Sequence, residues 1–111
     1  MSTPEKKVKD KVKRLLAEHK AYYFMPATHG YGSSGVPDIV ACLNGLFLGI
    51  ECKANGNKPT ALQMKNLSKL SSQGGIGVVV DETGLLHFEK LLVDLDAELK
   101  GSTWVLLKGS T

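Results

Sequence analysis

The sequence has few of the features that mark secreted, membrane-spanning or zinc-binding proteins. It contains 2 cysteines among 111 residues, too few for a zinc cluster, and 6% of its residues are aromatic. Its apolar runs fall well short of the roughly 20 residues that a bilayer-spanning helix needs. The N-terminus is charged and lacks the apolar core of a signal peptide, so export is not expected. Free thiols in a reducing cytoplasm are the expected state of the cysteines.

Several catalytic signatures are also missing. We find no glycine loop followed by Lys-Ser/Thr that would hold a nucleotide phosphate, and no nucleophile triad. Internal repeats, low-complexity tracts and interdomain linkers are absent from the sequence as well. We therefore expect one domain over residues 1–111, large enough to bury about two-thirds of its unfolded surface.

Positive charge is concentrated in one part of the chain. The formal net charge is +3, but residues 1–80 carry 11 Lys/Arg against 5 Asp/Glu, and residues 81–111 carry 3 against 6. The first twenty residues hold a large share of the cations: Lys6, Lys7, Lys9, Lys11, Lys13, Arg14 and Lys20. This concentration suits a polyanionic partner such as nucleic acid. A solvated helix face would produce the same pattern, so this feature alone leaves both interpretations open.

Apolar spacing and turn signals predict the element order α-β-β-β-α-β-α followed by a tail. Thr3-Pro4-Glu5 has the pattern of a helix start, and helical spacing continues to about residue 20. Both faces of the central hairpin are largely apolar, which favours a mixed sheet covered by helices on both sides. The other expected elements are strands at 22–25, 37–43, 46–53 and 76–80, helices near 60–72 and 87–99, and a tail at 102–107 that forms a last strand or a dimer contact.

The dipeptide Asn44-Gly45 predicts which residues face each other. Asn-Gly between apolar runs favours a hairpin with a two-residue type I′ turn. Counting outward from that turn places Asp38 opposite Glu51, with Cβ atoms roughly 4.5–5.5 Å apart on one face. Lys53 shares this face. Two facing acids are unfavourable unless a cation lies between them, so we expect a metal site with a lysine beside it. A bulge at Gly49 would shift the pairing by one residue.

The same count places Pro37 opposite Cys52. Proline has no N–H, so the main-chain carbonyl of Cys52 is expected to lack its ladder donor. That oxygen would lie next to the two carboxylates. Hard cations such as Mg²⁺ prefer oxygen ligands, often one or two carboxylates with waters.

Together these motifs resemble the PD-(D/E)xK nuclease superfamily, and within it the virus-type replication-repair nuclease (VRR-NUC) family. The motifs, in order, are Glu5, Gly35-Val36-Pro37-Asp38, Glu51-Cys52-Lys53 and Gln63. The resemblance covers about residues 5–80. It implies an α/β fold with a restriction-endonuclease-like core, a central mixed β-sheet flanked by helices. It also implies Mg²⁺, replaceable by Mn²⁺, held by Asp38, Glu51 and the carbonyl of Cys52.

The resemblance further implies a structure-specific DNA endonuclease whose catalytic residues are Glu5, Asp38, Glu51, Lys53 and Gln63. Small stand-alone members resemble Holliday-junction resolvases that act as homodimers, and a phage-encoded member would work in the host cytoplasm. Two alternatives stay open: a nuclease for flaps, nicks or unbranched duplex, and a non-catalytic DNA-binding module that assists recombination.

Some of these residues have a competing structural interpretation. Gln63 completes a Thr60-x-x-Gln capping box, and an acid such as Glu5 favours a helix N-terminus without any catalytic role. The competing interpretation of Lys53 is a purely electrostatic partner of the acids. His19 is expected to pack at the edge of the core, and His29 lies in a loop where DNA contact is the less favoured interpretation.

Overall fold

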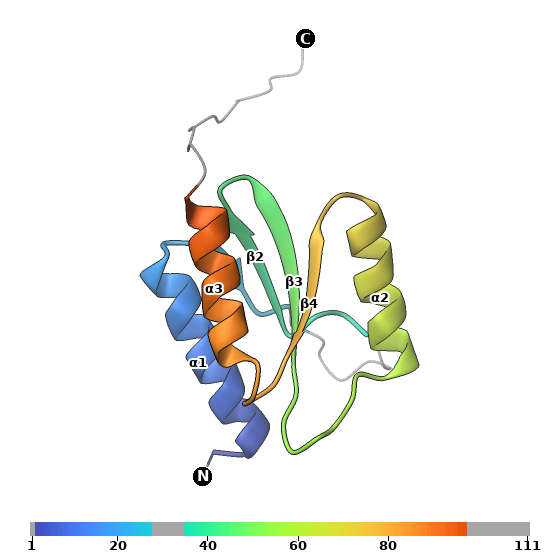
Figure 1. Cartoon of the computed structure of the whole chain (residues 1–111). Helices are drawn as coiled ribbons and strands as arrows, with labels where there is room; N and C mark the ends of the chain where they lie inside the picture. The colour runs from blue at the N-terminus through green and yellow to red at the C-terminus, as the bar shows by residue number, and fades with distance from the viewer. Residues whose placement is uncertain (1, 28–34, 98–111) are drawn as a thin grey trace, which may run out of the picture.

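The computed structural model describes residues 2–27 and 35–97, which form one four-stranded sheet with three helices (Figure 1). This confirms an α/β fold compatible with a restriction-endonuclease-like core. The element order is also the expected one up to the tail, which lies outside the described residues. In chain order the elements are α1 (Pro4–Glu18), β1 (Tyr22–Phe24), β2 (Ile39–Leu43), β3 (Leu46–Cys52), α2 (Ala61–Ser72), β4 (Ile76–Val80) and α3 (Leu85–Asp96).

The sheet is mixed, and its hairpin has the predicted register. The strand order is β1-β2-β3-β4, with β4 parallel to β3 and the other two pairs antiparallel. Asn44 and Gly45 have φ values of 54° and 82°, as a type I′ turn requires. Leu43 pairs with Leu46 and Ile39 with Ile50, so the ladder runs through Gly49 without a bulge.

Helices lie on both sides of the sheet, α1 and α3 on one face and α2 on the other (Figure 1). The face under α1 and α3 carries the main core. Alternate positions of the hairpin point into it because successive side chains of a strand face opposite sides. The buried apolar residues there include Val8, Val12 and Leu16 from α1, Ile39, Ala41, Leu43, Leu48 and Ile50 from the hairpin, and Phe88 and Leu92 from α3.

Helices lie on both faces of the sheet as expected, but α2 covers only part of the second face. Tyr22, Phe24 and Phe47 are 75%, 50% and 48% exposed. The register places them on one face of β1–β3, where about half or more of each side chain stays exposed. A helix about 10 Å wide can cover only about two strands spaced about 4.8 Å apart. α2 packs at the β3–β4 side, so an apolar strip over β1, β2 and the start of β3 stays open.

Most element boundaries differ from the predicted ones by a few residues. α1 ends at Glu18 rather than near residue 20, because the chain reverses at Lys20 with φ 59°. α3 begins at Leu85 rather than 87, directly after Gly84, and ends at Asp96 rather than near 99. The predicted strand or dimer contact at 102–107 lies outside the described residues. No described helix has the length and apolar content needed to cross a membrane.

Candidate active site

The predicted motifs meet at one end of the sheet, where β2 begins and β3 ends. All three helices also begin at this end (Figure 1). Thr3 caps α1 by accepting a hydrogen bond from the Lys6 N–H at 3.1 Å. Helix N-termini carry partial positive charge, which favours anionic groups nearby. The fold therefore gathers acidic side chains and helix starts in one place.

Asp38 lies directly before β2 and reaches across to β3. Its Oδ2 accepts a hydrogen bond from the Cys52 N–H at 2.8 Å. The Lys53 N–H donates to the carbonyl of Val80 at 2.9 Å, so Lys53 pairs with β4 and the backbone of Cys52 faces β2. Pro37, next to Asp38, has no N–H to donate to the Cys52 carbonyl. That this carbonyl oxygen is a metal ligand stays a prediction.

Glu51 is the one charged side chain among the buried residues of the described chain, with 1% exposure. Its Oε1 accepts a hydrogen bond from Gln63 Nε2 at 3.0 Å. Its Oε2 is buried and makes no hydrogen bond with any described residue. Burial raises the pKa of Glu51 to about 8, and the neighbouring Asp38 carboxyl adds to the shift. A buried oxygen without a donor beside a second carboxyl needs a proton or a cation.

Gln63 completes the capping box and also contacts Glu51, and its catalytic role stays a prediction. Its side-chain oxygen accepts the Thr60 N–H at 2.8 Å, and its backbone N–H donates to Thr60 Oγ1 at 3.2 Å, which completes the capping box. Its side-chain nitrogen remains free for Glu51. The start of α2 therefore fixes the orientation of the buried carboxylate.

Two glycines allow the backbone to pack this closely. Gly35 has φ +63°, and a Cβ there would lie 2.6 Å from Leu62 Cγ and 2.7 Å from the Leu62 carbonyl oxygen. The chain before Pro37 can thus press against the first turn of α2 only at a glycine. A Cβ at Gly49 would lie 3.1 Å from Cγ of Pro37. Sequence reasoning treated Gly49 only as a risk of a bulge, whereas it makes room for the Leu70 side chain, 2.6 Å from such a Cβ, and for the proline ring.

Glu5 lies near the acids, but a lysine stands between them. Lys9 Nζ is 3.7 Å from Glu5 Oε2 and 3.7 Å from Asp38 Oδ1. Among the described residues no three His, Cys, Asp or Glu side chains converge on one point. Sequence reasoning counted Lys9 only as part of the basic helix. The four-residue spacing from Glu5 was the available signal, because such pairs meet on a helix face.

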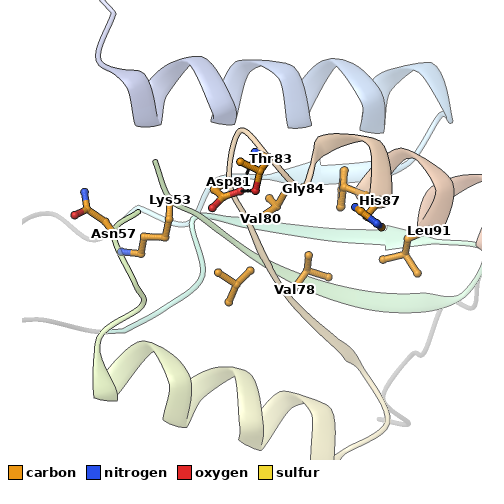
Figure 2. Close-up of a pocket in the computed structure, with 11 residues that line it drawn as sticks. Lys53, Asn57, Val78, Val80, Asp81, Thr83, Gly84, His87 and Leu91 are labelled. Atoms are coloured by element: carbon orange, nitrogen blue, oxygen red, sulfur yellow. Dashed lines mark hydrogen bonds between the residues drawn. The ribbon is translucent and has the colours of Figure 1, made fainter. Parts of the chain in front are cut away.

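Lys53 is placed beside the acids without pairing to them. It makes no ion pair with a described residue, and its charge opposes the upward shift of the Glu51 pKa. Its side chain lines a cavity of about 430 Å³ together with residues that include Asn57, Thr83 and His87 (Figure 2). Lys53 is therefore available to an anion that approaches this end of the sheet.

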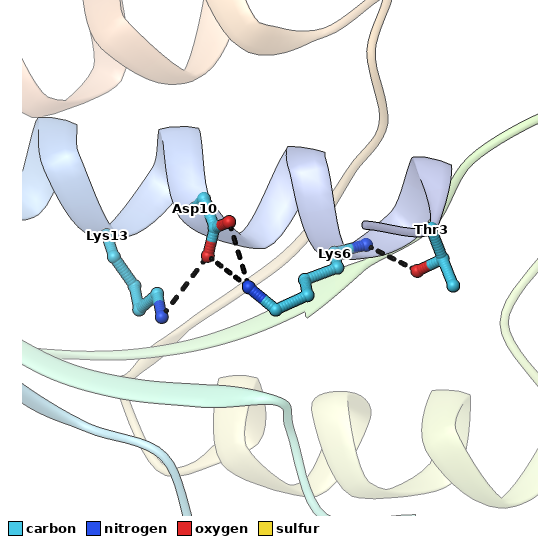
Figure 3. Close-up of polar contacts among 4 residues, drawn as sticks. All are labelled: Thr3, Lys6, Asp10 and Lys13. Carbon is cyan, nitrogen blue, oxygen red and sulfur yellow. Dashed lines mark hydrogen bonds and ion pairs between the residues drawn. The ribbon is translucent and has the colours of Figure 1, made fainter. Parts of the chain in front are cut away.

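The basic helix is partly neutralised by its own acid. Asp10 contacts Lys6 Nζ at 3.1 Å and Lys13 Nζ at 3.4 Å (Figure 3). These two lysines lower the pKa of Asp10, so it stays ionised. Lys7 and Lys11 make no ion pair with any described residue and are exposed. The solvated-face interpretation thus fits some lysines, and a surface able to meet a polyanion remains.

The histidines and cysteines lie apart from this arrangement or are unsuited to its chemistry. His19 Nδ1 lies 3.0 Å from Asp96 Oδ2, an edge contact between α1 and α3. His87 is exposed on α3, and His29 lies outside the described residues. Cys42 is exposed and Cys52 is buried, and both are free thiols. Burial raises the pKa of the Cys52 thiol to about 12, so it is not a nucleophile.

The donor set fits a hard divalent cation. Two carboxylates and one main-chain carbonyl supply oxygen ligands, which Mg²⁺ and Mn²⁺ prefer. The fit of a cation is supported by Oε2 of Glu51, which is buried and has no hydrogen-bond partner among the described residues. A divalent cation would also favour the ionised form of Glu51, which burial otherwise disfavours.

Comparison with known proteins gives one relevant similarity. No family model matches the chain. The chain is 42% identical over 55 residues to "Putative nuclease p44" of Acyrthosiphon pisum secondary endosymbiont phage 1. The matched segment spans 49% of this chain and 59% of the phage protein. The chain is therefore similar to a phage protein named as a nuclease over rather more than half of that protein's length.

Proposed function

We propose that this protein is a Mg²⁺-dependent endonuclease that hydrolyses phosphodiester bonds of structured DNA. The observation that carries the proposal is Glu51, a buried carboxylate held by Gln63 with one oxygen open beside Asp38. The similarity to a phage protein named as a nuclease supports the same class of reaction. The resemblance of the motifs to the VRR-NUC family also supports this class of reaction. That resemblance rests on the motifs alone, because no family model matches the chain.

Each residue of the site has a chemical task in this proposal. Asp38, Glu51 and the Cys52 carbonyl hold the cation, and Gln63 keeps the Glu51 carboxylate in position. When bound, Mg²⁺ would lower the pKa of a water and polarise the phosphoryl oxygen. Lys53 approaches the same phosphate and stabilises the negative charge that develops during the reaction. The N-termini of α1 and α2 add partial positive charge at the same end of the sheet.

The preferred substrate in this proposal is a four-way DNA junction cut by a homodimer in the cytoplasm of a phage host. A two-fold dimer would present two sites to a two-fold junction. The apolar strip formed by Tyr22, Phe24 and Phe47 supports the dimer, because exposed apolar patches often mark interfaces. A solution mass equal to two chains, reduced to one by Phe24→Asp, is expected. A wild-type mass of one chain would contradict the proposed dimer but not the proposed nuclease activity.

The activity is tested by nicking of synthetic DNA in Mg²⁺, in Mn²⁺ and in chelator. Four-way junctions, flaps, nicked duplex and unbranched duplex should be compared side by side. Asp38→Asn, Glu51→Gln and Lys53→Met are each expected to reduce nicking by about 100-fold or more with folding retained. Glu89→Gln and Lys90→Met on α3 are matched controls that should keep full activity.

The outcomes separate the candidate functions. Cleavage in chelator, or full activity of any of the three site variants, would contradict the assignment of the site. Faster cleavage of flaps or unbranched duplex would replace the junction as substrate. Binding without cleavage in both metals would favour the non-catalytic recombination module.

A further inference from the structure

We infer that Lys9 is a positioning residue that fills a second cation position and restricts the site to one divalent ion. The inference rests on the proposed function, because it concerns the metal that this function requires. It concerns whether Glu5 and Asp38 bind a second ion beside the one near Glu51.

The contacts of Lys9 distinguish it from the other cations of α1. Its Nζ lies 3.7 Å from both Glu5 Oε2 and Asp38 Oδ1. Lys6 and Lys13 instead contact Asp10. Lys9 directly follows Val8, which is 2% exposed and anchors the helix on the core. The packing of α1 therefore fixes the backbone of Lys9 near the acids, and its side chain, 33% exposed, reaches both of them.

Of the carboxylate oxygens of Asp38 and Glu51, only Glu51 Oε2 lacks a partner among the described residues. Asp38 Oδ2 accepts the Cys52 N–H, and Asp38 Oδ1 faces Lys9. Glu51 Oε1 accepts from Gln63, and Glu51 Oε2 has no described partner. One cation position is thus open near Glu51, and the position between Glu5 and Asp38 is taken by an ammonium group.

An ammonium group and a divalent ion cannot share this second position. Mg²⁺ needs oxygen ligands at about 2.0–2.1 Å, and Glu5 would have to leave Lys9 to provide one. The two like charges would also repel each other at this separation. If Lys9 were only a surface partner of Glu5, substitution of Lys9 would leave the number of bound ions unchanged.

The test is the number of Mn²⁺ ions bound per chain, measured by calorimetry and by electron paramagnetic resonance on the full-length protein without DNA. We expect one ion for the wild type and two for Lys9→Gln. The double variant Glu5→Gln with Lys9→Gln should return to one, because the second ion would lose a carboxylate. Lys13→Gln is the matched control on the same helix and should bind one.

A second readout is the thermal midpoint of unfolding of Lys9→Gln. It should fall without metal, because Glu5 and Asp38 lose their shared counter-ion, and Mn²⁺ should restore it more than in the wild type. A Lys9→Gln protein that binds one ion, or a wild type that binds two, would overturn the inference and leave the proposed function standing. A wild type that binds no Mn²⁺ would overturn both.

Discussion

At the scale of single residues, the site depends on how a buried acid is kept in place. Glu51 is 1% exposed and is held by one hydrogen bond from Gln63. An isolated buried carboxylate is costly unless it is paired or protonated. The residues around Glu51 therefore determine both its charge and the orientation in which it can meet a cation.

Gln63→Ala and Thr60→Ala should separate the two roles of Gln63. Gln63→Ala removes the donor to Glu51, and loss of such a supporting hydrogen bond typically costs 10–100-fold in metal affinity or activity. Thr60→Ala removes the acceptor of the capping box and should cost about 1 kcal/mol of stability. It should leave Mn²⁺ affinity within about threefold, since Nε2 of Gln63 still reaches Glu51. Equal losses of affinity in both variants would show that Gln63 acts only through the helix start.

The stability of the metal-free protein should fall as pH rises through the titration of Glu51. The folded protein keeps the Glu51 proton up to a pKa of about 8, whereas the unfolded chain loses it near 4.5. Between these values the folded state binds more protons, so the free energy of unfolding decreases with pH by about 1 kcal/mol per unit. Urea titrations at pH 5 to 8 measure this slope.

The matched variant for the pH experiment is Glu51→Gln, which has no proton to lose. Its slope should be smaller than that of the wild type by the contribution of Glu51. Saturating Mg²⁺ should flatten the wild-type slope as well, because a bound cation stabilises the ionised carboxylate. Identical slopes in the two proteins would contradict the raised pKa.

At the scale of elements, the hairpin and the start of α2 must approach closely for the site to form. The contact is made at Gly35, whose missing side chain leaves room for the backbone of Leu62. The motif glycine before Pro37-Asp38 thus has a packing reason that the sequence alone did not show. The register of the hairpin, in contrast, followed from the Asn44-Gly45 turn without knowledge of the tertiary structure.

Gly35→Ala should therefore cost more than strain at a positive φ alone. Gly45 has φ +82° and no atom within 4 Å of a Cβ, so Gly45→Ala is a control for backbone strain. We expect Gly45→Ala to cost about 1–2 kcal/mol. Gly35→Ala should cost about 1–3 kcal/mol more, because α2 must shift away from the loop. It should also weaken Mn²⁺ binding, which Gly45→Ala should not do. Equal stability losses in Gly35→Ala and Gly45→Ala would show that α2 can shift away from residue 35 without destabilising the protein.

At the scale of the whole molecule, the position of the positive charge matters more than its total. The net charge of +3 is modest. Lys9 contacts the site, and Lys6 and Lys13 lie on the same side of α1 through their shared partner Asp10. Lys11 lies on another side, where it lines a hollow with Leu85 and Glu89 of α3.

Two double variants with the same charge change test which side of α1 meets DNA. Lys6→Gln with Lys13→Gln should weaken binding of a synthetic junction more than Lys7→Gln with Lys11→Gln. Each lost phosphate contact reduces the slope of log K against log salt by about 0.9. Fluorescence anisotropy across a salt series, in chelator, measures both quantities. Equal effects would show that net charge, rather than its placement near the site, governs binding.

Local rules determined the hairpin, the order of the elements and the meeting of Asp38 with Glu51. They could do so because turn chemistry and strand periodicity act over a few neighbouring residues. Only the tertiary structure decided that Gln63 serves two partners, that Lys9 lies between Glu5 and Asp38, and that part of one sheet face stays uncovered. These features depend on how far apart whole helices and strands pack, which is set by the shapes of side chains distant in sequence.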